Sequence, residues 1–314
     1  MNLLITGGAG FIGSKFAELC LKEGHRVVII DDLNSILYSG QIKRERISKL
    51  KENFEFEFIQ NTILEHNHSM SLHEFETVIN FAALPGQLLS WAELTKYTMA
   101  NLVGVGSLID NYVLNKQVKF IQLSTSSVYG KNAIGSEIEI TKPYSPYGVT
   151  KKAAEDLINA YHQNFGIDYL ILRPFSVFGT GQRPDMAVHK FLVKIKNEEV
   201  IDIYGDGQQL RSMTPVTNIA NAVLNAVQTK SDSLPTRIFN LAGDDSISVN
   251  ELIEICEDVV GKSAKRNYVK TPAGDQLVTS GDSSLAKEFL KFDASVNVKN
   301  IIEDQYTSIV KNQY

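Results

Sequence analysis

The stretch Leu3-Leu4-Ile5-Thr6-Gly7-Gly8-Ala9-Gly10-Phe11-Ile12-Gly13 decides the fold, together with the segment that runs on to Asp31. It begins as a short apolar run, typical of a buried parallel strand, and continues into a glycine-rich turn. Apolar residues then recur at helical spacing until Gly24 offers a helix stop, and a second apolar run at 27–30 ends in Asp31. Strand, glycine turn, helix, strand and acid in this order predict a dinucleotide-binding unit.

Each part of this unit has a physical role in holding a dinucleotide. Glycine lets the backbone approach a pyrophosphate closely, and the following helix N-terminus offers free N–H groups and a partial positive charge. The acid that closes the second strand can accept hydrogen bonds from an adenosine ribose, and its charge would repel a 2′-phosphate, so we expect NAD rather than NADP. The spacing is G-x-x-G-x-x-G rather than G-x-G-x-x-G. The cofactor-binding residues predicted here are Gly7, Gly10, Phe11, Ile12, Gly13 and Asp31.

Composition limits the classes of protein to consider. The chain has 314 residues, 43% hydrophobic and 21% charged, with a net charge of −5, which argues against a nucleic-acid partner. Cys20 and Cys256 are far apart in sequence and suggest neither a disulfide framework nor a metal site. We see no signal peptide and no run long enough to span a membrane, so we expect a cytoplasmic protein.

Strands alternate with helices through the first half of the chain and predict a Rossmann-like, doubly wound parallel α/β sheet. We assign residues 1–172 to an NAD-binding domain. Residues 173–314 are less regular and are assigned to a smaller substrate-binding lobe, with segments returning to the Rossmann sheet. The mixed charges at 43–46 predict a solvated helix face.

A second signal is Tyr147-Gly148-Val149-Thr150-Lys151, on a helix predicted to begin with Ser145 as N-cap and to end near Gly166. Tyrosine and lysine four residues apart lie on one helix face. A phenol has a pKa of about 10, and a nearby ammonium favours its ionised form. The positive nicotinamide ring of bound NAD would add to this effect, and lowering the phenol pKa by about three units needs about 4 kcal/mol from the two charges together. A cluster of hydroxyls, residues 124–127, follows a predicted strand, where open α/β sheets bind ligands.

These motifs resemble the extended short-chain dehydrogenase/reductase family, and within it the NAD-dependent nucleotide-sugar epimerases. The resemblance covers nearly the whole chain and includes Ser124-Thr125-Ser126-Ser127-Val128-Tyr129-Gly130 and Arg173-Pro174-Phe175-Ser176-Val177-Phe178-Gly179. It continues through Arg183-Pro184-Asp185-Met186 and through Ile203-Tyr204-Gly205-Asp206-Gly207-Gln208-Gln209 before Arg211.

The resemblance implies roles for individual residues. Tyr147 would be the base, Lys151 would hold the nicotinamide ribose, and Thr125 would complete the catalytic triad. It also implies a UDP-sugar substrate and a homodimer that pairs the Tyr147 helix with the helix at about 91–116. The residues expected to contact the substrate are Ser126, Ser127, Ser176, Arg183 and Arg211.

Subclasses of the family differ beside the threonine. Dehydratases that resemble this chain carry an Asp-Glu pair there, and related decarboxylases carry a glutamate nearby; here Ser126 and Ser127 stand instead. The expectation is chemistry confined to C4: oxidation, rotation of the 4-keto sugar and reduction from the other face. The stretch around Arg183 looks most like UDP-glucuronate 4-epimerases, and this resemblance implies UDP-glucuronate and UDP-galacturonate as the substrate pair. An arginine fork can grip a carboxylate or a phosphate with two parallel hydrogen bonds.

Other readings stay open at this point. A UDP-glucose/UDP-galactose 4-epimerase, a nucleotide-sugar dehydratase or decarboxylase, and a non-catalytic NAD-binding regulator are the alternatives. His66, His68 and His73 are expected to be solvated rather than metal ligands, and Trp91 to serve packing rather than sugar stacking. The chain also departs from the family pattern at four positions, which leaves the local ligand contacts open: Thr62, Ser212, Asn218 and Leu277.

Overall fold

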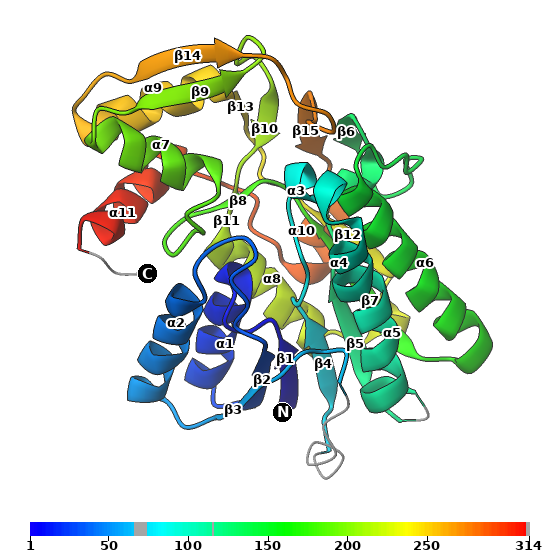
Figure 1. Ribbon diagram of the computed structural model, residues 1–314. Coiled ribbons are helices and arrows are strands. Elements are labelled where there is room, and N and C mark those ends of the chain that lie inside the picture. The colour runs from blue at the N-terminus through cyan, green and yellow to red at the C-terminus, as the bar shows by residue number, and fades with distance from the viewer. Residues whose placement is uncertain (66–73, 115, 312–314) are drawn as a thin grey trace.

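A seven-stranded parallel sheet forms the centre of the molecule (Figure 1). This computed structural model describes residues 1–65, 74–114 and 116–311. The strand order is β12-β7-β5-β4-β1-β2-β3. The chain adds β2 and β3 on one side of β1 and then crosses over to add β4, β5, β7 and β12 on the other side, as in doubly wound folds. The strands are β1 (Asn2–Thr6), β2 (Arg26–Asp31), β3 (Glu57–Gln60), β4 (Thr77–Asn80), β5 (Lys119–Leu123), β7 (Asp168–Pro174) and β12 (Ile238–Leu241).

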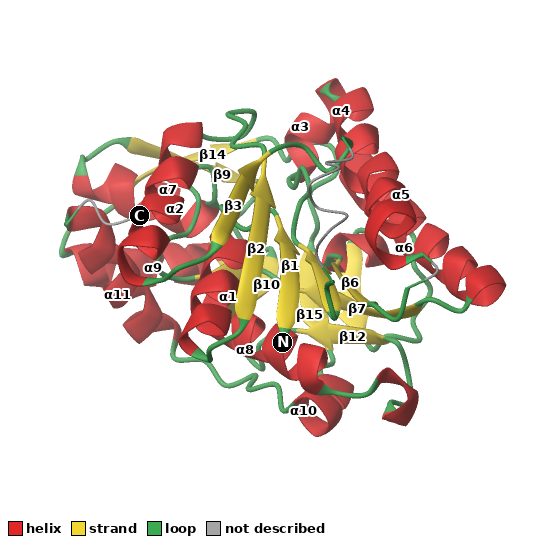
Figure 2. Cartoon of the chain, turned by 90° about the horizontal axis from the view of Figure 1, so that it is seen from below, coloured by secondary structure: helices red, strands yellow, loops and turns green. Residues whose placement is uncertain are grey.

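Helices cover both faces of this sheet (Figure 2). Alternate residues of a strand point to opposite faces, so Ile5 and Leu4 of β1 enter two separate apolar cores. One face is covered by α1 (Phe11–Lys22), α2 (Gly40–Asn53), α8 (Val216–Gln228) and α10 (Ser284–Leu290). The other is covered by α5 (Gly104–Leu108) and α6 (Pro146–Phe165), with the short helices α3 (Gln87–Ala92) and α4 (Leu94–Thr98) at one end.

The start and end of α6 follow the local sequence. The Ser145 hydroxyl accepts a hydrogen bond from the Gly148 N–H, Pro146 occupies the first turn, and Gly166 closes the helix in the left-handed region with φ of 69°. The single helix predicted for 91–116 is instead interrupted by π-helical turns at Met99–Val103 and Ile109–Val113. Such turns insert an extra residue and re-aim the side chains around them.

A smaller lobe lies over the carboxyl ends of the sheet strands (Figure 1). Its core is packed by α7 (Ala187–Lys196), α9 (Val249–Val260) and α11 (Val298–Val310). Its sheets are small. They are built from β6 (Asn132–Gly135), β8 (Val177–Phe178), β9 (Val200–Tyr204), β10 (Leu210–Ser212), β11 (Thr214–Pro215), β13 (Ser246–Ser248), β14 (Lys265–Val269) and β15 (Val278–Gly281).

The two halves of the chain exchange segments. Strand β12, from the second half, forms an edge of the large sheet, and β6, from the first half, pairs with β15 of the small lobe. We therefore propose the division into residues 1–172 and 173–314 as a division of roles rather than of backbone. No helix in the described ranges is both long and apolar enough to cross a membrane.

The prediction of a solvated helix face at 43–46 is wrong for two of its four residues. The charged helix α2 is not solvated along its whole length, because Lys43 and Arg46 are only 8% and 5% exposed and face the turn after β1. Trp91 is 55% exposed, and its Nε1 donates to the Ala273 carbonyl. The histidines at 66, 68 and 73 lie outside the described residues. Among the described residues, no three potential metal ligands gather in one place.

A buried ion pair joins α6 to the centre of the sheet. Arg173 of β7 donates from Nε and Nη2 to the two carboxylate oxygens of Glu155, at 3.0 and 2.7 Å, and both side chains are almost fully buried. The Ser124 hydroxyl donates to the same carboxylate at 2.5 Å. A third guanidinium donor reaches the Tyr129 hydroxyl. The network ties the end of β5, which begins the hydroxyl cluster, to the helix that bears Tyr147.

Removing one partner of this pair leaves a buried charge uncompensated. Glu155→Gln is expected to lower the free energy of unfolding by about 3–5 kcal/mol, measured by urea denaturation. Glu198→Gln, at the exposed Lys262–Glu198 pair, serves as the matched control and is expected to leave the midpoint nearly unchanged. Equal midpoints for the two variants would contradict the stabilising role of the buried pair.

Candidate active site

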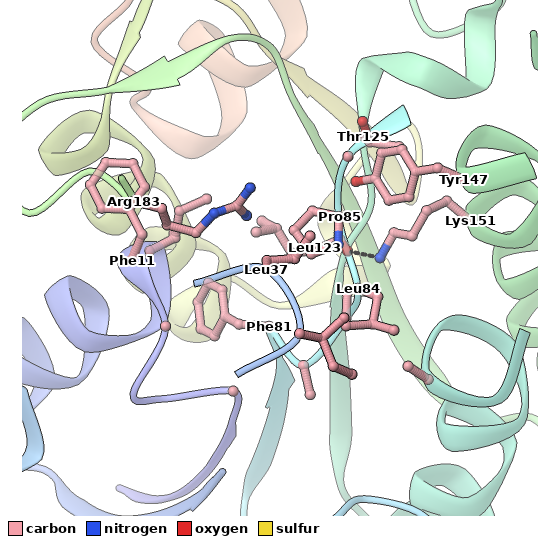
Figure 3. Close-up of a pocket in the computed structure, with 18 of the residues that line it drawn as sticks. Phe11, Leu37, Phe81, Leu84, Pro85, Leu123, Thr125, Tyr147, Lys151 and Arg183 are labelled. Atoms are coloured by element: carbon pink, nitrogen blue, oxygen red, sulfur yellow. Dashed lines mark hydrogen bonds between the residues drawn. The ribbon is translucent and has the colours of Figure 1, made fainter. Parts of the chain in front are cut away.

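A cavity of about 760 Å³ opens between the carboxyl ends of the sheet strands and the small lobe (Figure 3). In open α/β sheets this edge, at the switch in strand order, is where ligands bind. The size is in the range of small-molecule sites. Every residue predicted for the cofactor, the catalytic triad and the substrate lines this one cavity.

The turn after β1 has no space for side chains. Gly7 has φ of 70°, and a Cβ added there would lie 2.5 Å from the Ala82 backbone nitrogen. A Cβ on Gly13, in the first turn of α1, would lie 2.3 Å from the Gly7 carbonyl oxygen. The helix therefore packs directly on the turn, and its N-cap Gly10 and first residues line the cavity. This cradle fits a pyrophosphate.

Asp31 stands at the end of β2, beside this turn. Its carboxylate accepts hydrogen bonds from the Ala9 N–H at 3.1 Å and the Leu33 N–H at 2.9 Å. Burial raises the pKa of Asp31, while the Lys43 ammonium, 3.8 Å away, acts in the opposite direction. An acid held at the rim of the glycine turn fits the ribose of a dinucleotide such as NAD. Lys43 was missed from the sequence because its surroundings in α2 are polar.

Thr125, Tyr147 and Lys151 meet at one wall of the cavity (Figure 3). Thr125 follows β5, where its hydroxyl oxygen accepts the Ser127 N–H at 3.1 Å. Tyr147 packs edge to face on Tyr97, with the ring centroids 6.2 Å apart. Lys151 donates from Nζ to the Leu123 carbonyl at 2.6 Å. The backbone of β5 therefore holds the lysine, and the end of the same strand presents the threonine.

Burial determines the electrostatics of this wall. Burial raises the pKa of Tyr147, and the hydrogen bond with Thr125 and the charge of Arg183 lower it only in part. Burial lowers the pKa of Lys151 to about 8, against the charge of Glu155. In the protein alone, desolvation therefore outweighs the Thr125 hydrogen bond and the charge of Arg183, and the phenol pKa is not lowered. The lowering expected from Lys151 together with a bound nicotinamide ring stays a prediction. A positive charge bound beside the phenol would act against this burial effect.

The two predicted arginines each face an acid. Arg183 donates from Nε and Nη2 to Asp185, at 2.9 and 2.8 Å, and Arg211 donates from Nη2 to Asp275 at 3.0 Å. Asp275 supplies the partner for Arg211 from a segment 64 residues away. Both guanidinium groups line the cavity.

The structure also shows what surrounds the four residues that depart from the family pattern. The Ser212 hydroxyl donates to the Gly243 carbonyl, and Asn218 donates to the Asp293 carbonyl, so both serve the fold. Thr62 lines the cavity. Leu277 is 44% exposed.

Ser126 and Ser127 are both 6% exposed and lie on the cavity wall with Ser176. Two further polar residues there had no sequence signal. The side-chain amide of Gln87 donates to the Ser127 hydroxyl at 3.3 Å and to Gln276 at 3.0 Å. These contacts cross 40 and 189 positions of sequence, so no local motif could reveal them.

Comparisons with known proteins agree with this geometry. Residues 3–242 match the model of the NAD dependent epimerase/dehydratase family. A UDP-glucuronate 4-epimerase of Thermodesulfobacterium geofontis is 34% identical over 302 residues, which is 94% of this chain and 92% of that protein.

Solved structures extend the comparison to the whole fold. The crystal structure of a UDP-glucuronic acid 4-epimerase from Bacillus cereus, in complex with UDP-glucuronic acid and NAD, superposes with a TM-score of 0.94 at 34% identity, covering 100% of both chains. A UDP-glucose 4-epimerase of Thermotoga maritima with UDP-glucose superposes with a TM-score of 0.87 at 26% identity, also covering both chains fully. The chain belongs to the NAD dependent epimerase/dehydratase family.

Proposed function

We propose that the chain is an NAD-dependent 4-epimerase that interconverts UDP-glucuronate and UDP-galacturonate. The observation that supports this most directly is the meeting of Thr125, Tyr147 and Lys151 at one wall of a cavity whose other end is the glycine turn. The relatives support the substrate class, since UDP-glucuronate 4-epimerases match nearly the full chain. The fit of the glycine cradle and Asp31 supports NAD.

The residues of the chain supply binding and proton transfer. When bound, NAD would supply hydride transfer at the sugar carbon. Tyr147 is proposed to take the proton of the C4 hydroxyl, directly or through Thr125, and to give it back when the 4-keto sugar is reduced on its other face. Lys151, fixed by the Leu123 carbonyl, is proposed to hold the nicotinamide ribose. The remaining cofactor contacts proposed are Gly7, Gly10, Phe11, Ile12, Gly13 and Asp31.

The cavity wall supports epimerisation over the loss of water or carbon dioxide. Ser126 and Ser127 stand beside Thr125 and have no carboxyl group for acid–base chemistry. Glu155 lies behind the wall, where Arg173 and Ser124 occupy its carboxylate. Cys20 and Cys256 are buried, and burial raises the pKa of each to about 12, so neither fits a catalytic thiol.

We also propose a cytoplasmic homodimer. Apolar side chains remain exposed on the helices expected to pair: Leu94, Met99 and Val103 from the segment after β4, and Val149 from α6. Burial of these side chains against a second copy would remove apolar surface from water. Light scattering is expected to give twice the monomer mass at micromolar concentration, and a monomeric mass would contradict the dimer.

Tyr147→Phe tests the proposed acid–base role. The substitution keeps the ring against Tyr97 but removes the hydroxyl, so turnover is expected to fall by at least about 100-fold while bound NAD is retained. Tyr161→Phe, on the surface of the same helix, is the matched control and should keep full activity. Substantial turnover by Tyr147→Phe would remove the assignment. NAD binding without turnover of any UDP-sugar by the unaltered chain would instead favour a regulator.

Arg183 tests the preference for an acidic sugar. Because Asp185 already pairs with Arg183, a neutral sugar does not leave the arginine unpaired, and the penalty against it is smaller than for an isolated buried cation. Arg183→Ala removes a charge-assisted contact and leaves Asp185 to repel a uronate. The kcat/KM for UDP-glucuronate relative to UDP-glucose is expected to fall about tenfold or more.

Two control variants accompany this substitution. Asp185→Asn should keep or raise the same ratio, because it frees the guanidinium. Arg237→Ala, at an ion pair with Asp168, should not change the ratio. Equal losses for acidic and neutral sugars in Arg183→Ala would leave a general UDP-sugar 4-epimerase, with UDP-glucose and UDP-galactose as the alternative pair.

A further inference from the structure

Helix α2 buries two cations that its sequence pattern assigned to solvent. Lys43 and Arg46 are three residues apart, so they share one helix face. That face is turned inward, and the two side chains are 8% and 5% exposed. Burying a guanidinium costs free energy unless its donors find partners. The partners of Arg46 therefore show what the buried charge holds together.

The Arg46 guanidinium bridges the glycine turn and the loop that leads to Arg183. Nη1 donates to the Ala9 carbonyl at 3.2 Å, within the glycine turn. Nη2 donates to the Gly181 carbonyl at 2.6 Å, in the loop that precedes α7. Gly181 is two residues before Arg183, which lines the cavity. One side chain thus connects Ala9 and Gly181, which lie 172 positions apart in the sequence.

The peptide groups of Ala9 are held from both sides. The Ala9 N–H donates to the Asp31 carboxylate at 3.1 Å, while its carbonyl accepts from Arg46. Asp31 is the group expected to bind the ribose of the dinucleotide. A continuous path of hydrogen bonds therefore runs from Asp31 through Ala9 and Arg46 to Gly181.

Tyr38 contacts Arg183 directly. Its ring centroid lies 5.9 Å from the Arg183 guanidinium carbon, 5.8 Å from that of Arg46 and 5.5 Å from the Lys43 ammonium. All three are within the range of cation–π attraction. The Tyr38 hydroxyl also accepts a hydrogen bond from Arg46 Nη1 at 3.3 Å. Figure 3 shows the Arg183 guanidinium pointing into the cavity, toward the wall that carries Thr125 and Tyr147.

We propose that Arg46 and Tyr38 are positioning residues that couple dinucleotide binding at Asp31 to the placement of Arg183 at the sugar end of the cavity. A dinucleotide that orders the glycine turn also orders Gly181 through Arg46, so the sugar nucleotide meets an arginine already in place. This inference rests on the proposed function, because it takes UDP-glucuronate as the ligand of Arg183. Linkage requires the effect to be reciprocal: the sugar nucleotide must tighten dinucleotide binding by the same factor.

The test measures this factor by calorimetry on the full chain carrying Tyr147→Phe, which is expected to bind both ligands without turnover. NAD is titrated with and without saturating UDP-glucuronate. We expect UDP-glucuronate to tighten NAD binding about tenfold, within the usual range of coupling between sites. Adding Arg46→Met, which keeps the apolar stem but removes the donors, is expected to abolish this difference. If Arg46 were merely structural, its loss would weaken NAD binding equally with and without UDP-glucuronate, and the coupling factor would not change.

Matched variants guard against a folding artefact. Arg44→Met, at an exposed position of the same helix, should keep the full factor. Tyr38→Phe keeps the ring and is expected to keep most of the coupling factor. Tyr38→Leu loses the ring and is expected to lower the coupling factor by at least about threefold. These two variants test the proposal should Arg46→Met fail to fold. A parent chain without coupling, or an unchanged factor in both Arg46→Met and Tyr38→Leu, would overturn the proposal.

Failure of the proposed function is recognised separately. Epimerisation of UDP-glucuronate is assayed with Tyr147 intact, whereas the coupling is measured by binding alone. A chain that couples the two ligands but does not turn over UDP-glucuronate would overturn the function and support the positioning roles. A chain that epimerises UDP-glucuronate with no coupling would support the function and overturn the positioning roles.

Discussion

The contact between the first turn of α1 and the turn after β1 is the constraint on which the site depends. The Gly7 carbonyl lies where a side chain at position 13 would stand, so only hydrogen at that position lets helix and turn meet. This contact brings the free N–H groups of α1 to the mouth of the cavity. It also places Ala9 between Asp31 and Arg46. A wider turn would displace the glycine turn, the Asp31 contact and the Arg46 bridge to Gly181 together.

Around this contact the molecule places charges in local pairs rather than in a general field. The net charge is −5, yet the cavity contains Lys43 beside Asp31, Arg183 beside Asp185 and Arg211 beside Asp275. Each acid stabilises a cation that is partly or wholly removed from water. An anionic sugar nucleotide must therefore share these arginines with their acids. The pairing keeps the guanidinium groups oriented before a ligand arrives and moderates their preference for acidic ligands.

At the cavity wall formed by Thr125, Tyr147 and Lys151, burial rather than ion pairing determines the electrostatics. Burial disfavours both ionised Tyr147 and charged Lys151, so the protein alone does not create a phenolate. What it does create is position: β5 holds the lysine through a backbone carbonyl, and the Glu155–Arg173 pair ties β5, β7 and α6 into one unit. A cation bound in the cavity would then act on a phenol that is already desolvated, where electrostatic effects are strong.

The sequence by itself determined the elements whose signals are local. Glycine spacing predicted the turn and the first helix, Ser145-Pro146 and Gly166 set the bounds of α6, and apolar periodicity predicted the parallel strands, because each pattern repeats within a few residues. The resemblance to the family likewise predicted Thr125, Tyr147, Lys151 and the two arginines as site residues, and the structure places all five on one cavity. Only the tertiary structure decided which polar side chains leave the solvent and which partners they bind. Arg46 meets Gly181, Arg211 meets Asp275, and Gln87 meets Gln276 across 64 to 189 positions. Such contacts cannot be inferred from sequence periodicity, because these side chains are covered by distant segments rather than by their neighbours in the chain.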